Sequence, residues 1–286
     1  MEFLVILTAW LLLQWLGPGF MHPHDRWLVA WHLHASRALA LLPLPVRLLL
    51  IVALPPVLIA VLAWLLAHWL AGVLLFPLFL IVLTYSLGRG DYHTELDNYL
   101  ERWQRGDLEA AYQVALHSGF HAEPATDARE LHANMRRAAL YTGFQRWFAV
   151  VFWFAALGPA LALAYRIVHL LGTTAGTSPE ERALLRRWLG WLDWIPARLL
   201  GLAFAVTGNF VNCFRVWREH LLQNDDTGAL LVTYAAQAVP GAAAGSDELG
   251  GEHFVELAAN EIRELRDLVR RSAIFWLVML ALLQMW

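Results

Sequence analysis

The sequence predicts an all-helical membrane protein: a polytopic bundle of four to five transmembrane helices with amphipathic cytoplasmic helices attached. Hydrophobic residues make up 59% of the 286 residues and charged residues only 16%, which gives a mean hydropathy of +0.48. Such a chain carries more apolar surface than the core of a soluble domain needs. The apolar residues gather in long runs, and the polar stretches between them have helical spacing rather than a strand pattern.

Residues 1–46 are predicted to form an N-terminal interfacial or anchor segment. Its apolar stretch, Phe3 to Leu16, is shorter than the ~20 residues that a spanning helix needs, and no small-residue cleavage site follows it. Residues 47–87 are predicted to form a transmembrane hairpin, with helices from Arg47 to Leu66 and from Leu70 to Leu87. The prolines within these helices are kinks that lipid-embedded helices tolerate.

Residues 88–146 are predicted to form a cytoplasmic helical segment. Apolar residues recur at helical spacing from Thr94 to Trp103 and from Asp107 to Leu116, and Arg105-Gly106 separates the two runs. We therefore expect two short helices joined by a turn.

Residues 147–214 are predicted to contain two further transmembrane helices, with residues 167–197 between them. The third span is Trp147 to Tyr165, which contains a Gly158-Pro159 break. The fourth is Arg198 to Phe214, interrupted at Gly208-Asn209. Asp193 is expected to cap this fourth helix, with Pro196 in its first turn, because a carboxylate and a proline both suit a helix N-terminus.

Residues 215–271 are predicted to form a cytoplasmic linker and an amphipathic helix. The stretch from Pro240 to Gly251 has the glycine-rich composition of a flexible linker. Glu252 to Arg271 places Phe254, Ala258, Ile262, Leu265 and Val269 on one helical face. It continues without a helix breaker into residues 272–286, a short apolar C-terminal transmembrane segment.

The distribution of arginine predicts the orientation of the bundle. Most arginines lie before Arg47, after Leu87 or before Ser272, so the positive-inside rule places these three segments in the cytoplasm. The segment from Arg166 to Arg198 is then expected outside, on the side opposite Arg47. The protein is accordingly predicted to be a multi-pass protein of a bacterial inner membrane, with the lipid bilayer as its first partner.

Several functional classes find no support in the sequence. A net charge of −3 gives no indication of nucleic-acid binding, and the single cysteine, Cys213, excludes an intramolecular disulfide. The pairs His22 and His24, and His32 and His34, have weak metal-ligand spacing, so no metal site is predicted. There is no phosphate-binding loop, serine nucleophile elbow or zinc-protease helix. We predict no catalytic residue and no cofactor, although nucleotide and magnesium binding stay open without support.

Three motifs together carry a resemblance to a known family. They are Ser-Leu-Gly-Arg-Gly-Asp at residues 86–91, Gly-Pro-Ala-Leu-Ala-Leu-Ala-Tyr-Arg at 158–166, and Asp-Trp-Ile-Pro-Ala-Arg-Leu at 193–199. The chain resembles the AmpE family, inner-membrane proteins of the β-lactamase induction locus, over most of its length. That family is in turn similar to the CobD/CbiB family of membrane synthases, which attach an aminopropanol phosphate arm in cobalamin assembly.

The chain departs from the synthase pattern where carboxylates are expected. The synthases typically show Glu-x-x-x-Glu-Asn-x-x-Asp-Gly before the third span, and by register those places are held here by Arg137, Tyr141, Thr142, Gln145 and Arg146. After the span the synthases show Asn-Thr-Leu-Asp, whereas this chain has His-Leu-Leu-Gly at residues 169–172. ATP-dependent amide synthesis needs carboxylates for magnesium and for proton transfer. The resemblance therefore implies a retained fold without the synthase chemistry.

The resemblance implies a regulator of β-lactamase induction and cell-wall recycling that senses an anionic metabolite, nucleotide or lipid headgroup at its cytoplasmic face. Two alternatives stay open: a divergent ATP-dependent amide-forming synthase, and a membrane adaptor that docks a cytoplasmic protein through its C-terminal amphipathic helix. The oligomeric state is not indicated. The candidate ligand-binding residues are Gly88, Arg89, Gly90, Asp91, Arg137, Arg146, Tyr165, Arg166, Asp193 and Arg198.

Overall fold

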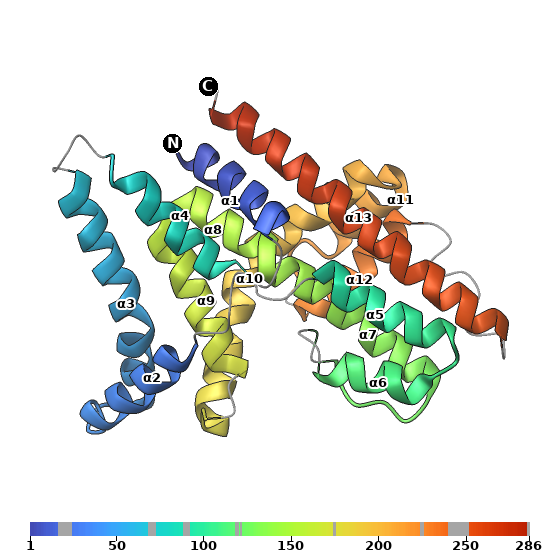
Figure 1. The fold of residues 1–286 in the computed structure, drawn as a ribbon, viewed down its shortest axis with the longest axis horizontal. Helices are drawn as coiled ribbons and strands as arrows, with labels where there is room; N and C mark the ends of the chain where they lie inside the picture. Colours follow the sequence, from blue (N-terminus) through green and yellow to red (C-terminus); the bar gives the residue numbers. More distant parts are fainter. Residues whose placement is uncertain are drawn as a thin grey trace. The chain divides into compact units, whose positions relative to one another are not determined.

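The computed structural model describes residues 1–16, 25–67, 73–87, 92–117, 120, 122–173, 176–223, 226–239 and 252–284. Across these residues every regular element is a helix, so the predicted all-helical class is confirmed (Figure 1). The chain divides into two compact units. Unit 1 comprises residues 1–89 and 149–193, and unit 2 comprises residues 90–148 and 194–286. The predicted linker from Pro240 to Gly251 lies outside the described residues.

Unit 1 is built from apolar helices, two of which are long and apolar enough to cross a membrane: α3, and α10, whose second half belongs to unit 2. The predicted helix from Arg47 to Leu66 lies within α3, whereas the helix predicted from Leu70 begins at Leu75. Phe3 to Leu16 is helical, as α1. The helices of this unit are α1 (Glu2–Leu16), α2 (Arg26–Ala38), α3 (Leu44–Ala67), α4 (Leu75–Ser86), α8 (Ala149–Leu157), α9 (Pro159–Thr173) and the first half of α10 (Pro179–Thr207).

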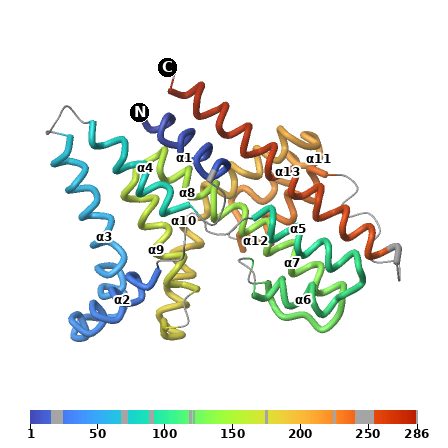
Figure 2. The backbone as a smooth tube through the Cα atoms, viewed as in Figure 1, coloured from blue at the N-terminus to red at the C-terminus, as the bar shows by residue number. Residues whose placement is uncertain are grey.

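Both of these long helices continue through internal prolines. A proline has no N–H, so the carbonyl four residues before it loses its helical donor. In α3 the carbonyl of Ile51, four residues before Pro55, accepts instead from the indole Nε1 of Trp31 at 3.0 Å. In α10 the carbonyl of Leu192, four residues before Pro196, accepts from Nε1 of Trp153 at 3.2 Å. Two tryptophans thus replace the donors missing at Pro55 and Pro196, and α3 runs through both of its prolines without interruption (Figure 2).

The predicted single span from Trp147 to Tyr165 is wrong. Gly158 has φ +82°, a left-handed conformation that favours glycine and ends α8. Pro159 then begins α9, a position where its missing N–H costs nothing. The contact between α8 and α9 is the most extensive between two helices of this unit, so the two form a hairpin. Apolar length alone suggested one crossing, and the glycine converts it into two shorter helices.

The predicted fourth span, Arg198 to Phe214, also differs from the structure. α10 is continuous from Pro179 to Thr207, and a separate helix, α11, begins at Phe210. Asp193 therefore lies in the middle of α10 rather than at its N-terminus, and the helix is capped at its start by Ser178, whose hydroxyl accepts from the Glu181 N–H. The indole of Trp153 explains why Pro196 does not end the helix.

The start of α10 lies beside the start of α3. Arg47 Nη2 donates to Glu181 Oε1 at 3.1 Å, and His32 Nε2 of α2 lies 3.6 Å from Glu181 Oε2. The apolar core of a bilayer is about 30 Å thick, so contacting side chains cannot lie on its two sides. The expectation that the whole segment from Arg166 to Arg198 lies opposite Arg47 is therefore wrong for the start of α10. That expectation assumed that Trp147 to Tyr165 crosses the membrane once and so carries the chain to the opposite side.

Unit 2 is built from amphipathic helices, which follow the predicted spacing closely. α5 and α6 match the predicted pair and meet at Gly106, with φ +75°. α13 continues from the amphipathic stretch into the apolar C-terminal segment as one helix, and its predicted apolar face is buried. The helices are α5 (Tyr92–Gln104), α6 (Leu108–His117), α7 (Ala128–Gly143), the π-helix η3 (Phe144–Phe148), the second half of α10, α11 (Phe210–Glu219), α12 (Thr227–Ala238) and α13 (Glu252–Gln284).

Two local features fix how the helices of unit 2 pack. Asp127, Asn209 and Asp226 cap α7, α11 and α12, because each side chain accepts a backbone N–H of the first turn. At Gly201 in α10 a Cβ would lie 2.4 Å from the ring of Tyr234 in α12. Only glycine permits this close approach.

Candidate functional site

Six of the ten predicted ligand-binding residues can be placed. Gly88, Arg89, Gly90 and Asp91 lie outside the described residues. Tyr165, Arg166 and Asp193 belong to unit 1, and Arg137, Arg146 and Arg198 belong to unit 2. Each group is described within its own unit.

In unit 1 the structure brings Tyr165 and Asp193 together. The Tyr165 hydroxyl donates to Asp193 Oδ1 at 2.8 Å, and Asp193 is only 1% exposed. Tyr165 and Arg166 on α9 are also buried. A buried carboxylate needs such hydrogen bonds because it has lost its water. Tyr165 and Asp193 thus form an internal polar contact between α9 and α10.

Arg198 in unit 2 contacts backbone carbonyls. It donates to the carbonyls of Leu221, at 3.2 Å, and Gln223, both of which follow α11. Its guanidinium lies over the ring of Trp194, 4.7 Å from the centroid, and its own carbonyl accepts from the Trp217 indole at 2.7 Å. These contacts hold the end of α11 against α10, which accounts for a buried arginine without a ligand.

Arg137 connects α7 to the start of α12. Its Nη2 donates to Asp226 Oδ2 at 2.9 Å, and the same oxygen accepts the backbone N–H of Ala229 as the cap of α12. Both charged side chains are exposed, at 41% and 57%. Exposed pairs of this kind contribute about 0–1 kcal/mol to stability.

Arg146 occupies the most distinctive position among the predicted arginines. It lies in η3, a π-helical turn between α7 and α8, and only 9% of the residue is exposed. π-Helical turns are uncommon and occur frequently at functional sites. Both terminal nitrogens of Arg146 reach Glu95 Oε2 of α5, but at 3.4 Å, which is long for a charge-assisted hydrogen bond.

A second arginine accompanies Arg146 beside Tyr92, a partly buried residue at the start of α5. Burial raises the pKa of the Tyr92 phenol, and the positive charges of Arg146 and Arg266 oppose that rise. Arg266 of α13 is paired with Asp97 of α5, Nη1 to Oδ1 at 2.6 Å. We call Tyr92, Glu95, Asp97, Arg146 and Arg266 the arginine cluster. Its two guanidiniums could hold an anion if one of them exchanged its carboxylate.

A charge cluster centred on the buried His132 and Glu261 holds α7 against α13. Glu261 Oε2 lies 2.7 Å from Nε2 of His132, and Glu261 Oε1 accepts from Arg136 Nη1 at 2.7 Å. Burial alone disfavours the charged form of Glu261. The hydrogen bonds and charges of His132 and Arg136 outweigh burial and hold the pKa of the Glu261 carboxyl below its usual range. The rings of Trp103 and Phe254 pack around His132.

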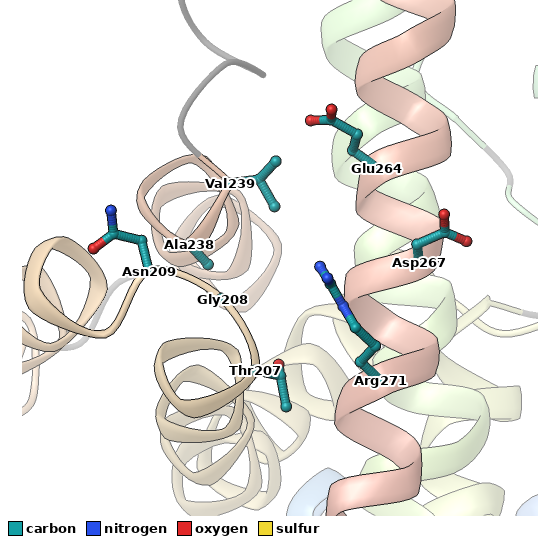
Figure 3. Close-up of a pocket in the computed structure, with 8 residues that line it drawn as sticks. All are labelled: Thr207, Gly208, Asn209, Ala238, Val239, Glu264, Asp267 and Arg271. Carbon is teal, nitrogen blue, oxygen red and sulfur yellow. The ribbon is translucent and has the colours of Figure 1, made fainter.

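An open groove of about 510 Å³ lies between α13 and the ends of α10 and α12. The side chains of Glu264 and Arg271 extend from α13 into this groove (Figure 3). Its other wall is formed by the Thr207–Asn209 turn and by the last residues of α12. The sequence did not single out these residues, since charged residues on an amphipathic helix are usually solvated.

Sequence reasoning also missed Tyr92, Glu95, Arg266, His132 and Glu261. Only the position of Tyr92, directly after the Gly-Arg-Gly-Asp motif, could have signalled a role. The pairs form between helices far apart in the chain, so no spacing rule finds them. Across the residues that the structure describes, no three His, Cys, Asp or Glu side chains are grouped closely enough to hold a metal ion. Of the weak histidine pairs, His22 and His24 lie outside these residues, and His32 faces Glu181.

These observations define the class: an all-helical protein with two helices of membrane-spanning length and hydropathy, and with arginines paired inside a charged helical unit. The chain belongs to the AmpE family. The model of that family, described as regulatory signalling modulator protein AmpE, matches residues 5–248.

A cobalamin biosynthesis protein CobD from Chromobacterium violaceum is 32% identical over 134 residues, which cover 43% of this chain and 40% of the relative. The match thus spans well under half of the relative's length. No solved structure matches this chain.

Proposed function

We propose that this protein is a multi-pass inner-membrane regulator of the AmpE type, linked to β-lactamase induction and cell-wall recycling, which senses an anionic ligand at its cytoplasmic face. The family description as a regulatory signalling modulator supports the regulatory part. The ligand's chemistry is that of a metabolite, nucleotide or lipid headgroup carrying a phosphate or carboxylate. The observation that carries the ligand part is the burial of Arg146 in a π-helical turn.

The arginine cluster suits this role because it brings two guanidiniums and two carboxylates together beside Tyr92. Arg266 makes a short bond to Asp97, whereas Arg146 is 3.4 Å from Glu95. A phosphate or carboxylate can take two parallel hydrogen bonds from one guanidinium. An incoming anion would therefore exchange with Glu95 at Arg146. Movement of Glu95 would shift α5, which would carry ligand occupancy to a partner.

The Gly88–Asp91 motif is included in this proposal through the chain itself. Asp91 directly precedes Tyr92, so the motif is covalently joined to the arginine cluster. Glycine-rich segments can present several backbone N–H groups to an anion. Replacing both Arg89 and Asp91 by Ala tests the motif, and unchanged induction with normal membrane insertion would remove it from the proposal.

Arg146 gives the sharpest test of ligand sensing. In a strain without its own AmpE, Arg146→Ala should lower β-lactamase induction at least to the level of the strain carrying no copy, whereas Arg146→Lys should retain part of it. Arg105→Ala is the matched control, because it removes an exposed arginine that pairs with Glu101 at the end of α5. Equal induction by Arg146→Ala and wild type, at equal amounts of membrane-inserted protein, would contradict the proposal.

The groove on α13 favours a second candidate, the membrane adaptor. The apolar face of α13 is already buried in unit 2, so a docked protein would have to use the exposed Glu264, Asp267 and Arg271. Reversing the charges with Glu264→Arg and Asp267→Arg tests this candidate without removing the helix. Loss of induction in these variants, with full induction in Arg146→Ala, would favour the adaptor over the ligand sensor.

The identity to a cobalamin biosynthesis protein is the observation that favours the third candidate, a divergent amide-forming synthase. It requires magnesium-dependent nucleotide binding. Among the places where the synthase carboxylates are expected, Thr142, Gln145 and Arg146 are buried and carry no carboxylate. Purified protein that hydrolyses ATP with an amine or corrinoid acceptor would nevertheless establish this function.

A further inference from the structure

We infer that the α8–α9 hairpin of unit 1 enters the lipid bilayer and returns to the side from which it came, with lipid acyl chains around its tip at Leu157 and Gly158. The start of α10 then lies on the same side of the membrane as the start of α3. This inference is independent of any ligand and concerns only helices of unit 1.

The hairpin has the composition of a buried membrane element. No charged residue occurs between Ala149 and Tyr165, and Arg166, in the middle of α9, is the first charge after the tip. At the tip Leu157 is 68% exposed, so the side chain that contacts the surrounding medium is aliphatic rather than polar. A charge at this depth would cost several kcal/mol in a bilayer, on the order of 2.5–3.5.

The backbone at the tip is also adapted to a medium without water. Irregular backbone at membrane depth requires that its polar groups be satisfied. The Gly158 N–H donates to the Phe154 carbonyl at 2.9 Å, and the Gly158 carbonyl accepts from Ala162 at 3.4 Å. Pro159 has no N–H to satisfy. Both backbone polar groups of Gly158 are thus paired, and Pro159 adds no N–H that lipid would leave without an acceptor.

The arms of the hairpin are too short to cross. At about 1.5 Å per residue, the 15 residues of α9 reach about 22 Å, against an apolar core of about 30 Å. The first arm continues the helical run of α7 and η3, but its uncharged part after Arg146, the 11 residues from Trp147 to Leu157, reaches only about 16 Å. α3, with 24 residues, reaches about 36 Å and is long enough. The hairpin therefore enters the apolar core without reaching the far side.

The contacts at the end of α9 determine on which side of the membrane the hairpin ends. Thr177, just before α10, donates to the Leu171 carbonyl of α9 at 2.8 Å, which ties the two helices together. Glu181, in the first turn of α10, contacts Arg47 and lies 3.6 Å from His32. Since Arg47 lies at the start of α3, the hairpin returns to the side where α3 begins.

Single-cysteine labelling in the membrane tests the inference. The variants are Leu41→Cys before α3, Glu180→Cys at the start of α10, Val73→Cys before α4, and Leu157→Cys at the tip. All four positions are exposed in the fold. Cys213 is the one native cysteine and is buried, so each variant is made both in the native chain and with Cys213→Ala. A membrane-impermeant maleimide is added to spheroplasts and to inverted vesicles, with full labelling in detergent as the reference.

We expect Leu41→Cys and Glu180→Cys to be labelled from one side, Val73→Cys from the other, and Leu157→Cys only in detergent. Labelling of Glu180→Cys from the side that labels Val73→Cys would overturn the inference, because the hairpin would then cross. Labelling of Leu157→Cys by the impermeant reagent from either side would also overturn it, because the tip would lie in water. A labelling pattern that contradicts the hairpin, in protein that still inserts into the membrane, would not contradict ligand binding at Arg146. The hairpin inference and the ligand proposal can therefore fail separately.

Discussion

The two units of this chain hold their helices together by different means. In unit 1, indole N–H groups replace backbone donors at prolines, and Tyr165 pairs with a buried Asp193 inside apolar helices. In unit 2, ion pairs between α5, α7, α12 and α13 join helices whose outer faces are polar. The difference is one of composition. Unit 1 pairs single polar groups within apolar helices, apart from the Arg47–Glu181 pair at the starts of α3 and α10, whereas unit 2 uses several ion pairs between helices.

The largest expected effect concerns the buried charge cluster of unit 2. Glu261→Ala should lower the free energy of unfolding by about 3–5 kcal/mol, because it leaves His132 and Arg136 without their carboxylate. Thermal and denaturant unfolding in detergent would measure it. Glu256→Ala, at an exposed position of the same helix, is the control and should change stability by less than about 0.5 kcal/mol. Equal effects of the two substitutions would show that unit 2 does not depend on this cluster.

The next effect contrasts two glycines of α10. Gly201→Ala should destabilise by about 1–3 kcal/mol or more, because its Cβ would meet the Tyr234 ring at 2.4 Å. Gly190→Ala meets nothing within 4 Å and should instead stabilise by up to about 1 kcal/mol through helix propensity. Unfolding temperatures of the two variants, compared with wild type, provide the measurement. A stabilising Gly201→Ala would mean that α10 and α12 are less closely packed than described.

A smaller effect tests the indole replacement in unit 1. Trp153→Phe keeps most of the ring but leaves the Leu192 carbonyl without its donor, which should cost about 1–2 kcal/mol. In a Pro196→Ala background the helix regains its own N–H, and Trp153→Phe should cost much less. A double-mutant cycle on unfolding measures the coupling. Additive effects would show that the indole does not substitute for the proline's missing donor.

The smallest effect is the acid response of unit 2. The pKa of Glu261 is held low in the folded state, so the unfolded chain binds its proton first as pH falls. The stabilisation from this group is complete above the unfolded carboxyl pKa, about 4.3, and is lost as pH falls through the lower folded pKa. Unfolding of the Glu261→Gln variant should therefore depend less on pH below about 4.3 than wild type. Identical acid profiles would assign the acid sensitivity to other carboxylates.

Helix periodicity predicted unit 2 better than unit 1. The apolar spacing of α5, α6 and α13 located both the helices and their buried faces, because each helix pairs an apolar stripe with a polar one. In unit 1 helices such as α1, α3, α4 and α8 are apolar on all sides, so their sequence predicts their length but not which face is buried. Gly158 divides the predicted third span into two helices that form a hairpin, and the Trp153 indole allows α10 to continue through Pro196.

The candidate site was predicted only in part. Arg146 was identified from its place before the Gly-Pro span, but its partner Glu95 and the second arginine, Arg266, come from distant helices. Asp193 was identified and assigned the wrong role, since a cap and a buried mid-helix carboxylate have the same sequence context near a proline. Pairings between helices depend on tertiary packing, which a single sequence does not specify.

The uninterrupted length of α13 has a mechanical consequence. Its 33 residues contain no glycine or proline and form a stiff rod about 50 Å long. The apolar end beyond Ser272 and the buried Glu261 lie on this rod, about 16 Å apart. A tilt of about 5° around Ser272 would displace Glu261 by about 1.5 Å, half the length of its hydrogen bond to His132. Any displacement of the apolar end of α13 would thus be transmitted to the charges around Glu261.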